Sequence, residues 1–214
     1  MDNELLVNIE SGIKELIESF KAKPYTFYSE NDLNSALFHI LSLKGVNKPC
    51  MSRLGRKKIP SSILHKEYPT KGRYKRNNRG PSIKKRRGTR GYYDICVWDS
   101  ETASRRQFKA SGGKNEQRTL VAIEMSLNEH HSLFEWRVYW DLLKLTDPDN
   151  EVEKGYILFF VRDYPYEKTG FPEDGFISKL KNMFDQEKKV NILYIESKGL
   201  ETRTVQISDT NFTI

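Results

Sequence analysis

Two short stretches decide the predicted fold, Gly91-Tyr-Tyr-Asp-Ile-Cys-Val-Trp98 and Leu120-Val-Ala-Ile-Glu-Met-Ser126. Each is an apolar, β-branched run of the kind that forms a buried strand. One acidic residue interrupts each run, Asp94 in the first and Glu124 in the second. Burying an unpaired carboxylate is costly, and burying two side by side costs more unless a cation neutralises them. The two stretches therefore predict a divalent-metal site.

The spacing of the two acids allows them to meet on one face of a sheet. Side chains alternate along a strand, so Asp94 and Glu124 converge at one end of the sheet if their strands are neighbours. Carboxylate oxygens bind hard cations such as Mg²⁺ or Mn²⁺. Such a metal polarises a phosphodiester and lowers the pKa of an attacking water.

The positive charge of the chain is concentrated in one segment. The sequence has 36 Lys and Arg against 29 Asp and Glu, a formal charge of +7. Between Lys71 and Arg90 there are ten Lys or Arg and no acid. A cluster of this kind is typical of a phosphate-binding surface, and a solvated loop or a localisation tract is the alternative. The residues predicted to bind nucleic acid are Lys71, Arg73, Lys75, Arg76, Lys84, Lys85, Arg86, Arg87 and Arg90.

Length and composition indicate one domain over residues 1–214, with a single core and long polar excursions, because only 37% of residues are hydrophobic and 30% are charged.

Cys50 and Cys96 are too few for a disulfide framework, which favours the cytoplasm, or the nucleus of a eukaryotic cell. The longest apolar run, residues 156–161, is too short to span a membrane. No P-loop or Gly-x-Ser-x-Gly pattern is present, which disfavours an ATPase or a serine hydrolase.

Apolar periodicity predicts a helix over residues 4–21 and a second helix that begins after Ser29, with Asp32 completing a capping box. Residues 44–90 are predicted to be a basic, loop-rich insertion with one strand at 62–68. Further strands are predicted near 92–98, 119–125, 155–161, 191–196 and 203–207, and further helices at 131–145 and 173–184. This order predicts an α/β fold with a mixed central β-sheet flanked by helices.

The order of elements and the two acids resemble the PD-(D/E)XK nuclease superfamily, whose restriction-endonuclease-like core is αβββαβ. The resemblance covers residues 28–163, which leaves 164–214 as a C-terminal extension. It implies that Asp94 and Glu124 are catalytic metal ligands for Mg²⁺ or Mn²⁺ in a DNA endonuclease. It also implies that Glu30, in the segment resembling the first core helix, can join the metal site. RNA as substrate, a homodimer and a subunit of a larger complex stay open.

The chain departs from the family motif at one position. The motif has a lysine two residues after its second acid, and this chain has Ser126 there. Lys144 on the following helix, or Lys109 and Lys114 between the two strands, are the predicted substitutes. That lysine stabilises charge on the phosphate, a role that a serine hydroxyl cannot fill alone. Alternatively, catalysis has been lost and the fold acts as a nucleic-acid-binding or complex-scaffold module.

Each acid also has a structural explanation. Asp94 would form a buried salt bridge with Arg90 or Arg118, and Glu124 would face solvent on an edge strand. Glu30 would have only a structural role, because an acid in the first turn of a helix interacts favourably with the macrodipole. His130 and the histidine after it are expected at an exposed helix start, because no further ligands complete a zinc site.

Overall fold

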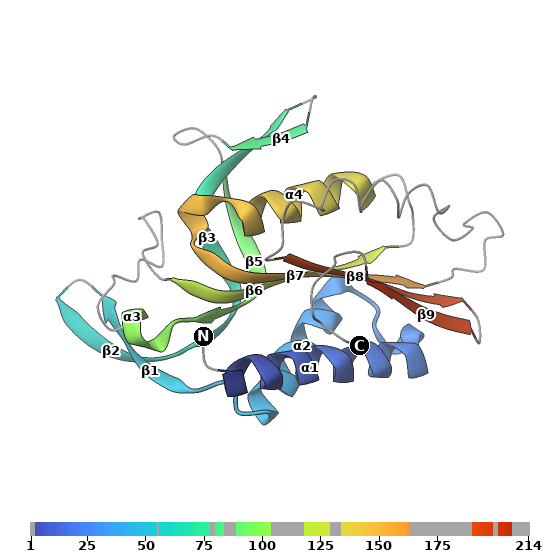
Figure 1. The fold of residues 1–214 in the computed structure, drawn as a ribbon, viewed down its shortest axis with the longest axis horizontal. Coiled ribbons are helices and arrows are strands. Elements are labelled where there is room, and N and C mark those ends of the chain that lie inside the picture. The colour runs from blue at the N-terminus through green and yellow to red at the C-terminus, as the bar shows by residue number, and fades with distance from the viewer. Residues whose placement is uncertain are drawn as a thin grey trace.

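The computed structural model describes residues 3–54, 56–77, 80–83, 89–103, 118–128, 134–162, 190–198 and 201–206. They form an α/β fold around a seven-stranded mixed sheet of order β4-β3-β5-β6-β7-β8-β9 (Figure 1). Its strands are β3 (Leu64–Asn77), β4 (Gly80–Ile83), β5 (Thr89–Trp98), β6 (Thr119–Asn128), β7 (Val152–Arg162), β8 (Val190–Lys198) and β9 (Glu201–Gln206). The β6–β7 and β7–β8 pairs are parallel and the other pairs are antiparallel. The predicted fold class, a mixed sheet flanked by helices, is confirmed.

Helices cover both faces of this sheet. The helices α1 (Asn3–Ala22) and α2 (Glu30–Leu43) lie on one face, and α4 (Phe134–Thr146) lies on the other (Figure 1). Three short helices, η1 (Pro24–Thr26), α3 (Ser100–Ala103) and η3 (Pro148–Asn150), complete the set in the described residues. The helix α2 begins at the predicted capping box, in which Ser29 and Asp32 exchange hydrogen bonds. Burial of the apolar faces of α1 and α2 forms the core on that side.

The prediction of a loop-rich insertion over residues 44–90 is wrong for most of its length. Strands β1 (Pro49–Leu54) and β2 (Lys57–Ser62) pair with each other as a separate two-stranded sheet. Strand β3 continues well past the predicted 62–68 and pairs with both β4 and β5. The hydrophobic pattern did not predict these strands, because much of their length lies away from the main core and lacks apolar alternation.

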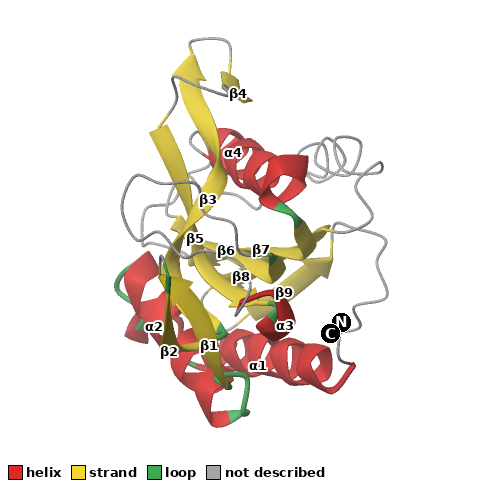
Figure 2. Ribbon diagram, turned by 90° about the vertical axis from the view of Figure 1, so that its left-hand side faces the viewer, coloured by secondary structure: helices red, strands yellow, loops and turns green. Residues whose placement is uncertain are grey.

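The far end of β3, with β4 and the start of β5, stands beyond α4 as a projecting arm (Figures 1 and 2). We call this part the β3–β5 arm and define it as residues 71–77, 80–83 and 89–91. Its antiparallel pairing is offset by a bulge between Pro69 and Arg73. Bulges bend a strand and increase its twist, which accounts for the departure of the arm from the body of the sheet.

The remaining predicted elements are largely confirmed. The helices at 4–21 and 131–145 correspond to α1 and α4, and the five strands after residue 90 correspond to β5 to β9. The predicted helix at 173–184 lies outside the described residues. In the described part of the chain, no helix has the length and apolar character needed to cross a membrane.

Candidate acidic site beneath helix α4

The two predicted metal ligands face each other across adjacent strands. Ile95 of β5 pairs with Ile123 of β6, and continuing this antiparallel register by one residue places Asp94 opposite Glu124. The Met125 amide donates a hydrogen bond to Asp94 Oδ2 at 2.6 Å. Glu124 is 2% exposed and Asp94 is partly buried. The structure therefore brings the two carboxylates together on one face of the sheet, and the solvent-facing alternative for Glu124 is wrong.

Helix α4 covers this face and contributes Lys144. The Lys144 Nζ atom lies 2.6 Å from Glu124 Oε2 and 3.0 Å from Asp141 Oδ1, and it donates a hydrogen bond to the Tyr92 carbonyl oxygen at 3.0 Å. The lysine is only 6% exposed. A Cβ atom added at Gly91 would lie 3.0 Å from Lys144 Cδ, so glycine at this position makes room for the lysine stem.

Glycine also allows α4 to approach the sheet. A Cβ atom added at Gly155 of β7 would lie 3.0 Å from Leu145 Cδ1, tighter than ordinary van der Waals contact. Leu145 is fully buried next to Lys144. Close packing of these two elements therefore sets the depth at which Lys144 enters the acidic site.

Glu30 reaches the edge of the same site from the opposite helix layer. The guanidinium of Arg162, at the end of β7, donates hydrogen bonds to the carbonyl oxygens of Phe27 and Tyr28, just before α2 begins. This contact holds the start of α2 near the sheet. Arg137 of α4 then pairs with Glu30, with 3.2 Å between Nη1 and Oε2.

Burial raises the pKa of all four carboxyl groups at this site. The pKa of Asp94 rises to about 6, because burial outweighs the Met125 hydrogen bond and the charge of Lys144, while Asp141 and Glu30 raise it further. Burial also raises the pKa of Glu124 well above its ordinary value, and Asp141 and Asp94 add to the rise. The pKa values of Asp141 and Glu30 are raised by burial as well.

Lys144 shows the complementary effect. Burial alone would lower its pKa, but the surrounding carboxylates, Asp141 and Glu124 first, raise the pKa above the ordinary value of lysine. Among the described residues, two cationic side chains, Lys144 and Arg137, therefore pair directly with these four acids. The site has a deficit of positive charge.

Sequence reasoning missed Asp141. Its signal was present, because Arg137, Asp141 and Lys144 are spaced four and three residues apart and so share one face of a helix. The alternative explanation of Asp94 by a salt bridge with Arg118 is wrong, because Arg118 pairs with Glu153 at 2.9 Å and lies 3.7 Å from Asp99.

Five of the nine residues predicted to bind nucleic acid lie on the arm. Arg73, Lys75 and Arg76 lie on β3 and Arg90 lies on β5. Lys71 is already paired, with its Nζ 3.2 Å from Glu151 Oε2. The segment of residues 84–87, like the alternative lysines Lys109 and Lys114 and His130 with the histidine after it, lies outside the described residues.

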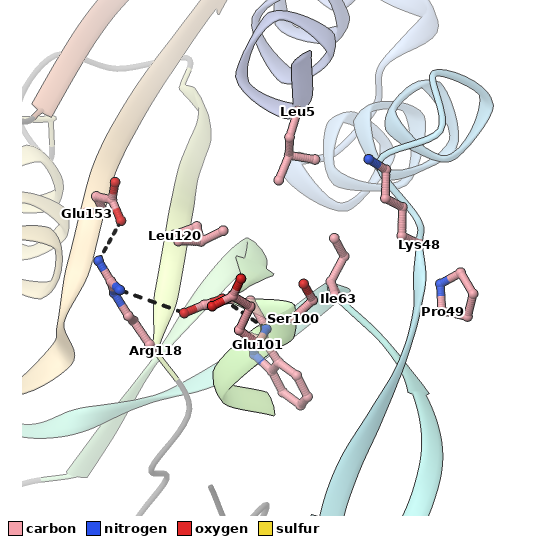
Figure 3. Close-up of a pocket in the computed structure, with 11 residues that line it drawn as sticks. Leu5, Lys48, Pro49, Ile63, Ser100, Glu101, Arg118, Leu120 and Glu153 are labelled. Atoms are coloured by element: carbon pink, nitrogen blue, oxygen red, sulfur yellow. Dashed lines mark hydrogen bonds and ion pairs between the residues drawn. The ribbon is translucent and has the colours of Figure 1, made fainter. Parts of the chain in front are cut away.

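A separate hollow of about 380 Å³ lies beyond the far end of β5, next to Trp98 (Figure 3). Arg118 lies between Glu153 and Asp99 in this hollow and pairs with both. None of the four acids of the site beneath α4 lines it.

The donor chemistry beneath α4 suits a hard divalent cation, because all the candidate ligands are carboxylate oxygens. Glu124 Oε1 is buried and accepts no hydrogen bond, so one oxygen of the site is left for a ligand. In the described residues, no three His, Cys, Asp or Glu side chains stand ready as a preformed metal cluster. Lys144 occupies the other oxygen of Glu124.

Comparisons of the chain with protein-family models, with curated proteins and with solved structures found no match. A fold alone does not specify a function, so the function of this chain depends on the chemistry of the site.

Proposed function

We propose that this protein is a metal-dependent nuclease of the restriction-endonuclease-like type that hydrolyses phosphodiester bonds in DNA. The observation that carries the proposal is the site beneath α4, where Asp94 and Glu124 face each other and Lys144 contacts Glu124. Such a cluster of buried acids with raised pKa values beside a buried lysine is unfavourable for stability and is typical of a functional site.

The order of the elements supports the same proposal. When the β1–β2 pair, the edge strand β4 and the short helices α3 and η3 are left out, the chain from α2 to β7 runs helix, three antiparallel strands (β3, β5 and β6), helix, strand, with β7 parallel to β6. Asp94 lies on the second of these three strands and Glu124 on the third. This is the arrangement that the resemblance to the PD-(D/E)XK superfamily implies, with Lys144 from the following helix in place of Ser126.

The residues have separable roles in this proposal. Asp94 and Glu124 would hold Mg²⁺ or Mn²⁺, and Glu30 would assist from the edge of the site. The metal, when bound, lowers the pKa of the attacking water and polarises the phosphate. Lys144 stabilises negative charge that develops on the phosphate, in a buried setting where one positive charge has a large effect.

The β3–β5 arm is the proposed contact with the DNA backbone. It stands on the side of the sheet that α4 covers (Figure 1) and belongs to the segment in which ten basic residues occur without an acid. Lys and Arg contacts to phosphates release counterions, so binding through the arm will weaken steeply with salt.

The first test is cleavage of supercoiled plasmid and of single-stranded DNA in Mg²⁺, Mn²⁺ or EDTA. Wild type is compared with Asp94→Asn, which keeps the size of the side chain, and with Asp149→Asn, a matched control at an exposed acid on η3. We expect metal-dependent cleavage by wild type and the control and none by Asp94→Asn. Full activity in Asp94→Asn would refute the assignment.

A second candidate function is a nucleic-acid-binding module without catalysis. It is favoured by one observation, that Lys144 pairs with both Glu124 and Asp141, the oxygens of which a metal would need. This candidate predicts salt-dependent DNA binding by a folded protein that cleaves nothing under any metal condition.

A further inference from the structure

We propose that Glu124 and Asp141 form a cation-exchange site in which the Lys144 ammonium is the resident cation and a divalent metal is its competitor. The inference rests on the proposed function of the same site. It assigns Asp141, a residue outside the family motif, to the metal site. It also gives Lys144 two positions, one paired with the acids and one released toward the substrate.

The first support is the way in which Lys144 is used. An ammonium group has three N–H donors and no acceptor. Three oxygen partners surround Nζ, Glu124 Oε2 at 2.6 Å, Asp141 Oδ1 at 3.0 Å and the Tyr92 carbonyl at 3.0 Å. All three donors are therefore occupied, and no donor remains for a phosphate oxygen. The lysine must leave at least one of these partners before it contacts the substrate.

The second support is the balance of charge. Asp94, Glu124, Asp141 and Glu30 carry four negative charges when ionised, against one positive charge each on Lys144 and Arg137. The remaining deficit of two charges equals the charge of one Mg²⁺ or Mn²⁺ ion. A divalent cation that binds Glu124 and Asp141 would therefore neutralise the site and weaken their hold on Lys144.

The third support is independent of the charges. Glu124 is 98% buried, as its exposed fraction is 2%, and its Oε1 atom accepts no hydrogen bond. A buried carboxylate oxygen without a partner is costly and rare. It gives a cation a first contact at the site while Lys144 still occupies Oε2.

The consequence is that metal binding and lysine release are the same event. Without metal, Lys144 occupies Glu124 Oε2 and Asp141 Oδ1 and stabilises these buried acids. With metal, the donors of Lys144 become available to a phosphate. The chain therefore keeps its site closed until a divalent cation enters, although Ser126 replaces the lysine of the motif.

The test is the affinity for Mn²⁺, measured by isothermal titration calorimetry without DNA. Lys144→Met removes the competing charge and keeps an unbranched side chain. We expect Lys144→Met to bind Mn²⁺ at least tenfold more tightly than wild type, and Asp149→Asn to bind like wild type. The double variant Lys144→Met with Asp141→Asn should lose most of the gain. Equal or weaker binding by Lys144→Met, including no binding at all, would overturn the exchange.

A second measurement uses the wild-type protein and so does not depend on the folding of a variant. The ¹⁵N–¹H signal of the Lys144 ammonium, assigned by its absence from Lys144→Arg, reports its ion pairs. Addition of Mg²⁺ should shift or broaden this signal, whereas an equal ionic strength of NaCl should leave it unchanged. A signal indifferent to Mg²⁺ would overturn the proposal.

These outcomes separate the inference from the proposed function. If wild type cleaves DNA with metal but Lys144→Met gains no affinity for Mn²⁺, the exchange is wrong and the nuclease stands. If no variant binds Mn²⁺ and none cleaves, both proposals fail together.

Discussion

Asp94→Asn should stabilise the metal-free protein at neutral pH, although it removes the residue expected to be essential for activity. The reason is that the Asp94 carboxylate is buried among other acids and is destabilising when ionised. The pKa of Asp94 rises from 3.8 to about 6, with burial as the largest cause. An asparagine keeps an oxygen that can accept the hydrogen bond from the Met125 amide without bringing a negative charge.

The magnitude follows from linkage between protonation and folding. One pKa unit corresponds to about 1.4 kcal/mol, so the rise in the pKa of Asp94 corresponds to about 3 kcal/mol of lost stability above pH 7. Because the pKa is raised in the folded state, the folded protein binds the proton more tightly than the unfolded chain. The contribution of the Asp94 proton to the free energy of unfolding is therefore fully present below about pH 4 and is lost as the pH rises through about 6.

The assay is urea unfolding in EDTA at several values between pH 4.5 and 8, followed by circular dichroism. We expect Asp94→Asn to exceed wild type by about 2–3 kcal/mol at pH 7.5, with the difference shrinking toward pH 4.5. Asp149→Asn is the matched control and should follow wild type. Saturating Mg²⁺ should narrow the gap, because only wild type keeps the ligand. A lower stability of Asp94→Asn at pH 7.5 would refute the reasoning.

Two further predictions concern the attachment of the arm, and a third concerns the basic residues at 84–87. Gly72→Ala should lower the free energy of unfolding by about 1–3 kcal/mol, because the new Cβ atom would lie 2.5 Å from the Tyr74 hydroxyl and would collide with Asp147 Oδ2; an unchanged urea midpoint would contradict this. Asn150→Ala should cost about 1–3 kcal/mol, because the buried Gly72 amide loses its 2.7 Å acceptor, and the same unfolding assay measures it. Neutralising the four basic residues at 84–87 should reduce the slope of log K against log salt for duplex DNA by up to about 4. Fluorescence anisotropy measures this slope, and an unaltered value would exclude those residues from the contact.

The sequence predicted elements whose pattern is strong and local. Helix α1 carries apolar residues at helical spacing, and β5 and β6 are apolar runs broken by single acids. The strands β1, β2 and β4 could not be found in this way, because their pairing partners, and not an apolar face, specify them. The length of β3 is likewise specified by its pairing with β5, a strand that comes later in the chain, after β4.

The residues of the candidate site also differ in how far the sequence predicts them. Asp94 and Glu124 were predictable because a single acid in an apolar strand conflicts with burial and needs an explanation. Lys144 was one of several alternatives, and its choice needed the packing of α4 against Gly155 and Gly91. Asp141 was missed because an acid next to a tryptophan on a helix has the same local pattern as an exposed residue. Its spacing from Arg137 and Lys144 indicates only a shared helix face, and the ion pair with Lys144 places it in the site.

The replacement of the motif lysine leads to a final prediction. Ser126 lies two residues after Glu124 on β6 and so faces the same side of the sheet. If the chemistry needs a cation beside the phosphate and not a particular position in the sequence, Ser126→Lys combined with Lys144→Met should recover cleavage relative to Lys144→Met alone.

The same double variant discriminates the two roles given to Lys144. A lysine at position 126 belongs to the strand and not to α4, where Asp141 lies. It should therefore supply the charge at the phosphate without competing equally for the acids. We expect the double variant to cleave DNA at lower Mn²⁺ concentration than wild type. Cleavage that returns with the wild-type Mn²⁺ dependence would mean that Lys144 acts only on the phosphate. No recovery in a folded double variant would mean that the Lys144 position itself is required, because Lys144 approaches the acids from α4 and not from β6.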